Sequence, residues 1–207
     1  GRPNAGKSSL TNRLVGSERT IVSDVAGTTR DAIDTAFEYN EEKYVIIDTA
    51  GIRRKSKIEE DLEYYSVLRA MKAIGRADVC VMMLDAVEGL TDQDKRIAGI
   101  AHEEKKPLII CVNKWDLLEK DNKTMKKFEE GLRVDLPFLS YAPILFISAF
   151  TGQRVLNILK MANHIYEEYT KRISTGLLNS VLKDAIAVNE PPTRKGRAIK
   201  INYATQI

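Results

Sequence analysis

The sequence contains few of the residues that build metal or disulfide sites, since its 207 residues include two cysteines, two histidines and one tryptophan. Cys80 and Cys111 lie inside the apolar runs VCVMML and LIICVN, and their spacing matches no metal motif. We therefore expect both thiols to be small buried hydrophobic groups in a reducing compartment. His102 and His164 have no partners at a catalytic or ligand spacing, so we expect them at the surface or the edge of the core.

Long hydrophobic runs are also missing. No stretch approaches the roughly 18 apolar residues that a membrane span needs, and the start lacks the basic and apolar segments of a signal peptide. We therefore expect a cytoplasmic protein without a membrane span. The composition, with 43% hydrophobic residues and a net charge of +3, indicates a real core and permits contact with nucleic acid without requiring it.

The first residues, GRPNAGKSS, fit the phosphate-binding loop pattern G-x-x-x-x-G-K-[ST]. In such a loop, glycines let backbone N–H groups surround a polyphosphate, a lysine reaches the β- and γ-phosphates and a hydroxyl binds Mg²⁺. Lys7 and Ser8 fit the last two roles, and SSLTNRLVG supplies a helix whose N-terminal end faces the phosphates. A flexible loop that matches by chance is the alternative. Because such a loop ordinarily follows a buried strand, we expect a fragment or the visible part of a longer chain.

Two later segments supply what hydrolysis needs. GTTR places Thr28 and Thr29 in a polar loop, where a threonine completes the Mg²⁺ shell when a γ-phosphate holds the loop, although such sequences are also common in ordinary turns. VIIDTAG places Asp48 where it can hold Mg²⁺ through a water, and Gly51 where its N–H can meet the γ-phosphate; a strand-ending turn is the alternative. Ile52 replaces the glutamine with which many small GTPases orient the attacking water, so another group must do so.

The motif NKWD, which ends in Asp116, indicates guanine recognition at the end of a buried strand. A carboxylate accepts hydrogen bonds from N1–H and the exocyclic amino group of guanine, and adenine lacks this donor pair. Asn113 and Lys114 are expected to brace the loops around the base. Ser148 and Ala149 end a later strand, where a backbone N–H could meet guanine O6 or where small residues simply end the strand.

Strands alternate with amphipathic helices, which predicts a parallel α/β sheet with right-handed crossovers. The expected strands are 32–39, 43–47, 79–86, 108–112 and 143–149, with a hairpin turn at 40–42. The expected later helices are 61–74, with Leu68 and Met71 on its apolar face and Gly75 at its end, then one opened by 91–94, 121–134 and 155–169. After Lys171 we expect a helix at 176–189, a loop at 189–197 and a basic strand at 198–207.

With these motifs in order, the chain resembles the Era-like GTPases and, more closely, the Der (EngA) family of double GTPases, in which two GTPase domains precede a KH-like domain. Further likeness lies in GTTRD, DTAGIRRK, SVLRAMKAI, DQDKRIAG, YAPILFISA and the terminal NYATQ. The resemblance implies a P-loop NTPase-type α/β GTPase domain over 1–171, with a mostly parallel sheet flanked by helices and its first strand missing. It also implies the start of a KH-like domain over 172–207 and a preceding GTPase domain in the same chain.

The resemblance further implies a Mg²⁺-dependent factor that hydrolyses GTP to GDP and phosphate. Its expected partners are the large ribosomal subunit, which it helps to assemble, and rRNA. Asn4 would help to hold a K⁺ beside the phosphates, or it only shapes the loop; we favour the first role. The alternative is a nucleotide-sensing RNA- or ribosome-binding module with little intrinsic hydrolysis, which Ile52 keeps open. A relative that acts on tRNA modification is disfavoured by NYATQ.

The predicted site consists of catalytic residues, nucleotide-binding residues and metal ligands. The catalytic residues are Lys7, Thr29 and Gly51. The nucleotide-binding residues are Asn4, Ala5, Gly6, Lys7, Ser8, Ser9, Thr28, Thr29, Asp48, Gly51, Asn113, Lys114, Asp116, Ser148 and Ala149. The predicted metal ligands are Ser8, Thr29 and Asp48 for Mg²⁺ and Asn4 for K⁺.

Overall fold

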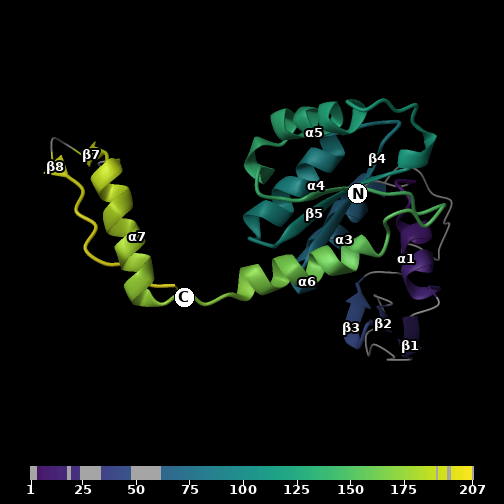
Figure 1. Ribbon diagram of the computed structural model, residues 1–207, viewed down its shortest axis with the longest axis horizontal. Coiled ribbons are helices and arrows are strands. Elements are labelled where there is room, and N and C mark those ends of the chain that lie inside the picture. The colour runs from purple at the N-terminus through teal and green to yellow at the C-terminus, as the bar shows by residue number, and fades with distance from the viewer. Residues whose placement is uncertain are drawn as a thin grey trace. The chain divides into compact units, whose positions relative to one another are not determined.

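The computed structural model describes residues 4–17, 20–23, 34–47, 62–189, 191–194 and 197–206. The chain forms two compact units, Gly1–Tyr166 and Glu167–Ile207. Figure 1 shows the helices and strands of each unit. The first unit carries the described part of the predicted nucleotide site.

The first unit alternates strands and helices, as the sequence predicts. Its helices are α1 (Lys7–Val15), α3 (Leu62–Arg76), α4 (Asp92–Glu103), α5 (Thr124–Asp135) and α6 (Asn157–Thr170), whose last turn falls in the second unit; short 3-10 helices are η1 (Trp115–Leu117) and η2 (Pro137–Leu139). Its strands are β1 (Thr20–Ser23), β2 (Thr35–Tyr39), β3 (Glu42–Ile46), β4 (Cys80–Asp85), β5 (Leu108–Asn113) and β6 (Ile144–Phe146).

Strands β4, β5 and β6 form a parallel sheet with β5 in the middle. Every residue of β5 is buried, as expected of a central parallel strand covered on both faces. Asp85 at the end of β4 lies opposite Asn113 at the end of β5. Their polar side chains therefore stand at the carboxyl edge of the sheet, where open α/β sheets bind ligands.

Helices cover both faces of this parallel sheet (Figure 1). On one face, Leu84 of β4 belongs to a core cluster with Ile97 of α4. On the other face, Ile109 of β5 clusters with Leu10 of α1 and Ile158 of α6. Alternate residues of the strands thus face opposite helical layers, which fixes α1 and the loop before it against the sheet.

The strands β1, β2 and β3 form a separate antiparallel sheet in that order. Asn40 and Glu41 connect β2 to β3 and have φ values of 51° and 67°, which is typical of a two-residue type I′ turn. Glu42, predicted as part of the turn, is the first residue of β3. Phe37 and Tyr39 pack into the cluster that contains α1. Within the described residues, no strand pair joins this sheet to β4–β6.

Helix α3 differs from its prediction in two ways. It continues through Gly75 to Arg76, so Gly75 does not end it. Leu68 and Met71, predicted to face the core, are 37% and 44% exposed, whereas Ile74 is buried in the core. The predicted face was wrong because a row of residues spaced by three drifts by about 60° at each step around a helix of 3.6 residues per turn.

The second unit contains helix α7 (Thr175–Val188) and a short hairpin of β7 (Thr193–Arg194) and β8 (Arg197–Ala198). The predicted helix is confirmed, with none of its residues buried. The predicted strand at 198–207 is wrong, because residues 199–206 are not in a strand.

Side-chain amides replace the missing strand pairing. Asn179 of α7 donates to the backbone oxygen of Ala204 at 2.8 Å and accepts from its N–H at 2.9 Å. Gln206 accepts from the Ile173 N–H at 2.8 Å and donates to the Lys171 oxygen at 3.0 Å. The NYATQ segment is thus held by backbone-to-amide bonds of the kind that a neighbouring strand would supply.

The cysteines behave as predicted within this fold. Cys111 is fully buried and its thiol is free, as is that of the half-buried Cys80. Burial raises the pKa of Cys80 to about 11 and raises the pKa of Cys111 further. Both thiols are therefore uncharged at neutral pH and act as packing groups. Among the described helices, none has the length and apolar character to cross a bilayer.

Candidate guanine-nucleotide site

The loop before α1 has the backbone that an anion site needs. Asn4 and Gly6 have positive φ values of 65° and 96°, and α1 begins directly afterwards at Lys7. No side chain caps the start of α1, and its first turn contains no acidic residue. No side chain therefore offsets the positive end of the helix dipole, which suits a phosphate at this position.

Gly6 is required by space as well as by conformation. A Cβ atom at Gly6 would lie 2.1 Å from Nδ2 of Asn113, far inside van der Waals contact. Its φ of 96° also lies in a region that residues with a side chain rarely adopt. The second glycine of the motif therefore lets the phosphate loop approach the end of β5.

Asn113 joins three segments that are far apart in the sequence. Its Nδ2 donates to the backbone oxygen of Ala5 at 2.9 Å, and its Oδ1 accepts from the N–H of Ala149 at 2.9 Å. The side chain is buried, with 3% of the residue exposed. The expected bracing role of Asn113 is thus visible in its contacts: one amide fixes the phosphate loop and the 148–149 loop to the sheet edge.

Asp116 carries the carboxylate of the NKWD motif and lies in the short helix η1. Its Oδ1 is buried and has no hydrogen-bond partner among the described residues. The neighbouring Trp115 is 3% exposed and anchors η1 in the core, where it packs against Phe146 with ring centroids 4.4 Å apart. A buried acceptor without a partner is costly unless a ligand satisfies it. Asp116 therefore fits the donor pair of guanine.

Lys114 bonds to a residue that the sequence did not single out. Its ammonium forms an ion pair with Asp85, whose side chain is 3% exposed. Burial acts to raise the pKa of Asp85, but Lys114 and the backbone N–H groups of Val87 and Glu88 outweigh it and hold the pKa below its ordinary value. The register of β4 and β5 could have indicated this contact, because Asp85 ends its strand as Asn113 does.

The loop after β6 is closed by its own hydrogen bonds. The hydroxyl of Ser148 accepts from the N–H of Thr151 at 3.0 Å, and its backbone oxygen accepts from Gly152 at 2.9 Å. Ser148 is fully buried and donates its N–H to Gln153 at 3.1 Å. Since the Ala149 N–H is bonded to Asn113, any contact of this N–H with guanine O6 would have to be shared or exchanged.

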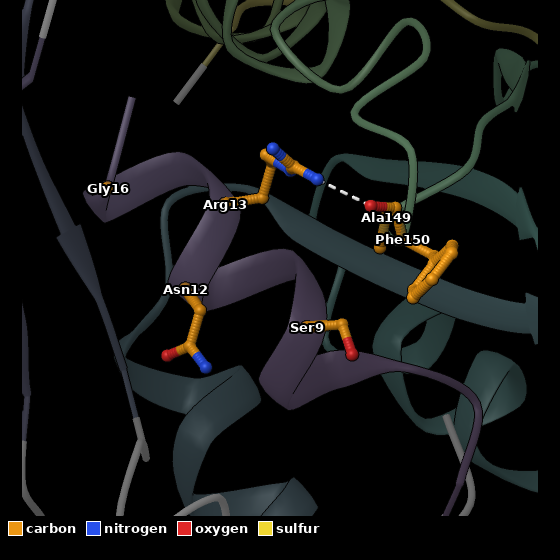
Figure 2. A pocket seen from close by; sticks show the side chains of 6 residues that line it. All are labelled: Ser9, Asn12, Arg13, Gly16, Ala149 and Phe150. Carbon is orange, nitrogen blue, oxygen red and sulfur yellow. Dashed lines mark hydrogen bonds between the residues drawn. The ribbon is translucent and has the colours of Figure 1, made fainter. Parts of the chain in front are cut away.

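A pocket of about 260 Å³ lies between α1 and this loop (Figure 2). Ser9 and Ala149, both predicted to bind nucleotide, line it together with residues that the sequence analysis missed. Figure 2 shows Arg13 extending from α1 to the backbone oxygen of Phe150, with which it forms a hydrogen bond. Arg13 had no motif to mark it; Phe150 follows the predicted Ser-Ala pair directly, and that position was its only signal. The remaining lining residues are Asn12 and Gly16.

The structure covers part of the predicted catalytic and metal set. Thr28, Thr29, Asp48 and Gly51 lie outside the described residues. Ser8 stands exposed in the first turn of α1, where its hydroxyl oxygen is the type of ligand that Mg²⁺ prefers. Within the described ranges, no cluster of three or more His, Cys, Asp and Glu residues could hold a metal by itself.

Comparisons with known proteins identify the family. The family described as "50S ribosome-binding GTPase" matches residues 1–114, and the "KH-domain-like of EngA bacterial GTPase enzymes, C-terminal" family matches residues 172–207. GTPase Der of Fusobacterium nucleatum is 74% identical over 208 residues, and GTPase Der of Caldanaerobacter subterraneus is 60% identical over 207. Each comparison covers 100% of this chain and 47% of the relative, so the chain spans about half the length of these relatives.

A solved structure gives the same picture at greater distance. Era in complex with MgGDPNP and nucleotides 1506–1542 of 16S ribosomal RNA is 30% identical, with a TM-score of 0.60. The match covers 84% of this chain and 56% of that Era chain. The phosphate loop, the Asn113 brace and the matched families all point the same way. The chain belongs to the 50S ribosome-binding GTPase family and, within it, to the Der (EngA) proteins, as a P-loop GTPase domain with the start of the KH-like domain.

Proposed function

We propose that the chain binds GTP and GDP and hydrolyses GTP as part of a ribosome-associated GTPase. The observation that carries the proposal is the bridge made by Asn113, which ties the phosphate loop to the loop at Ala149. Asp116, three residues further along the chain, has a buried Oδ1 without a hydrogen-bond partner among the described residues. A phosphate cradle and a carboxylate with a guanine-compatible acceptor thus meet at one sheet edge.

Binding would divide between the two ends of the site. The N–H groups at the start of α1 and the Lys7 ammonium would hold the β- and γ-phosphates, and Asp116 would accept from N1–H and the amino group of guanine. When bound, Mg²⁺ would neutralise charge that develops on the β- and γ-phosphate oxygens. Ser8, Thr29 and Asp48 would hold it.

Hydrolysis would proceed by in-line attack of water on the γ-phosphorus. The new P–O bond forms as the bond to the bridging oxygen breaks, the electron pair leaves with GDP, and the water proton passes to the released phosphate. The Gly51 N–H would contact the γ-phosphate, and Thr29 would hold the first switch closed. Ile52 cannot orient the water, so Asn4 would help to hold a K⁺ beside the phosphates that stabilises the developing charge.

The larger biological role is proposed from the family. The matched family is described as ribosome-binding, and the relatives are twice as long as this chain. We propose action in assembly of the large ribosomal subunit, with contacts to rRNA and a preceding GTPase domain in the same chain, in the cytoplasm. The GTPase domain would span 1–171 and the start of the KH-like domain 172–207. A nucleotide-sensing module with little hydrolysis is the second candidate, favoured by Ile52.

Nucleotide binding and turnover separate these candidates. Calorimetry with GDP and ADP should show a strong preference for GDP, and Asp116→Asn should shift preference toward xanthosine diphosphate, because the amide can donate to its 2-oxo group. Phosphate release from GTP should be faster in K⁺ than in Na⁺ at constant ionic strength, and Asn4→Ala should remove that difference. GDP binding without measurable turnover in either salt would favour the sensing module, and equal affinity for ADP would contradict both candidates.

A further inference from the structure

We propose that Asp85 is a positioning residue for base selection: it holds the Lys114 ammonium away from Asp116 and so keeps the Asp116 carboxylate free for guanine. This proposal rests on the guanine site proposed above. It assigns a role to a buried carboxylate that lies outside the four GTPase motifs, at the end of the neighbouring strand β4.

Both oxygens of Asp85 are committed. One oxygen pairs with the Lys114 ammonium, and the other accepts from the N–H of Val87 at 2.9 Å and of Glu88 at 3.4 Å. The side chain is 3% exposed, while that of Lys114 is 33% exposed. The backbone donors fix the orientation of the carboxylate, so Asp85 offers the lysine a rigid anchor at the sheet edge.

The lysine needs such an anchor because of its place in the chain. Lys114 has a left-handed backbone conformation with φ of 61° and lies two residues before Asp116. A lysine side chain is a long flexible stem with a compact charge, and it pairs readily with a nearby carboxylate. Without Asp85, the base-reading carboxylate would be the acidic group next to Lys114 in the motif.

A second lysine near Asp116 is held in a similar way. Lys120 donates to the backbone oxygen of Trp115 at 2.6 Å, and its ammonium lies 5.9 Å from the centre of the Trp115 ring. Both lysines that flank Asp116 in the sequence thus have other acceptors, and the Asp116 Oδ1 has none among the described residues. The Asp116 carboxylate thus lies between two lysines in the sequence, and neither lysine is recorded as a partner of its Oδ1.

Pairing of Lys114 with Asp116 would affect the binding of guanine and of hypoxanthine differently. Guanine offers Asp116 two hydrogen bonds, from N1–H and from the amino group, whereas hypoxanthine offers only N1–H. A lysine bound to Asp116 would compete for one carboxylate oxygen and would cost guanine more than hypoxanthine. Asp85 should therefore widen the preference for GDP over inosine diphosphate.

The test is the substitution Asp85→Asn, which keeps the shape and the acceptor for the two backbone N–H groups and removes the charge. Calorimetry should show GDP affinity reduced about tenfold and inosine diphosphate affinity reduced much less, so that the ratio of the two shrinks. Adding Lys114→Met to Asp85→Asn should restore the ratio, because the lysine that Asp85 had held is then no longer there to pair with Asp116. A merely structural role for Asp85 would give no such rescue.

A matched control is Asp135→Asn, which removes an exposed ion pair with Lys95 and should leave the ratio unchanged. An unchanged ratio in Asp85→Asn, or equal losses for both nucleotides that Lys114→Met does not rescue, would overturn the proposal. If circular dichroism shows that Asp85→Asn is unfolded, Asp85→Ser takes its place, because it also removes the charge and keeps a hydroxyl acceptor; the ratio must then shrink for the proposal to stand. Failure of wild-type protein to prefer GDP over ADP would instead refute the guanine site itself.

Discussion

Each of the two units of the chain is stabilised internally, and the contacts that do so differ between them. The first unit contains two clusters of buried side chains on the two faces of its parallel sheet, and its polar braces, such as Asn113, are themselves buried. In the second unit, α7 contributes no buried residue, and the segment 199–206 is tied down by the partly exposed amides of Asn179 and Gln206. The same kind of hydrogen bond between a side chain and the backbone is therefore buried in the first unit and partly exposed to solvent in the second.

This difference decides what a substitution should cost. Removing a buried side chain that bonds to the backbone leaves unpaired backbone groups that water cannot reach. When such a side chain lies at the surface, water can take over its hydrogen bonds. Substitutions in the two units should therefore differ in cost, and the largest cost is expected where the geometry is least tolerant.

Gly6→Ala should have the largest effect. The new Cβ would collide with Asn113 Nδ2 and would force a strained φ, so both the phosphate loop and its brace must shift. We expect GDP affinity to fall about a hundredfold or more and stability to fall by roughly 1–3 kcal/mol. Calorimetry and urea unfolding measure these changes. Gly99→Ala is the control: its Cβ meets nothing within 4 Å in α4, and the change should be neutral or slightly stabilising.

Asn113→Ala should come next. It leaves the Ala5 oxygen and the Ala149 N–H without their buried partner, and each such group costs roughly 1–3 kcal/mol. GDP affinity should fall as well, since both loops lose their common anchor. Urea unfolding of the full chain, followed by Trp115 fluorescence, checks the stability. A loss below about 0.5 kcal/mol would mean that the loops hold their positions without the amide.

Asn179→Ala removes the corresponding amide in the second unit and should cost less. Its bonds to Ala204 are partly exposed, so we expect a loss of about 0.5–1.5 kcal/mol that is confined to this unit. Hydrogen exchange should quicken at Ala204 while exchange in β5 and GDP affinity stay at wild-type values. Faster exchange in β5 would show that the two units are coupled, against the contrast drawn here.

The pH dependence contributed by Asp85 should be the smallest effect. Its pKa is lowered in the folded chain, so its contribution to stability is complete above the ordinary carboxyl value of about 3.9 and is lost as pH falls through the folded pKa. Unfolding measured between neutral and acid pH should show a shallower loss for Asp85→Asn than for wild type in this window. Parallel curves would mean that the Lys114 pair has no net effect on folding.

The sequence predicted the phosphate loop, the helix order and the buried strands because these depend on local spacing. It also predicted that residues 91–94 open α4, where Thr91 and Asp94 form reciprocal bonds in the structure. It missed Asp85, Arg13 and Phe150, since each acts on a residue that only the folded sheet brings near.

Two wrong predictions have different origins. Alternating polarity predicted a strand at 198–207, but the Asn179 side chain takes the backbone bonds of Ala204, and the Gln206 side chain bonds to the backbone of Lys171 and Ile173. The apolar row that includes Leu68 and Met71 predicted the core side of α3, yet both side chains are exposed. Periodicity predicts which residues share a face of a helix or strand. It does not predict which other elements pack against that face.

Strand β5 has a consequence for how the chain is made. Its sequence LIICVN is apolar, rich in β-branched residues and free of proline, which is the composition of an aggregation-prone segment before it is covered. Lys105 and Lys106 precede it and Lys114 follows it, so charge stands at both ends. We expect these lysines to act as gatekeepers that keep newly synthesised copies apart until β4 and β6 pair with the strand. The lysine of the base-reading motif would then protect the unfolded chain as well as serve the folded one.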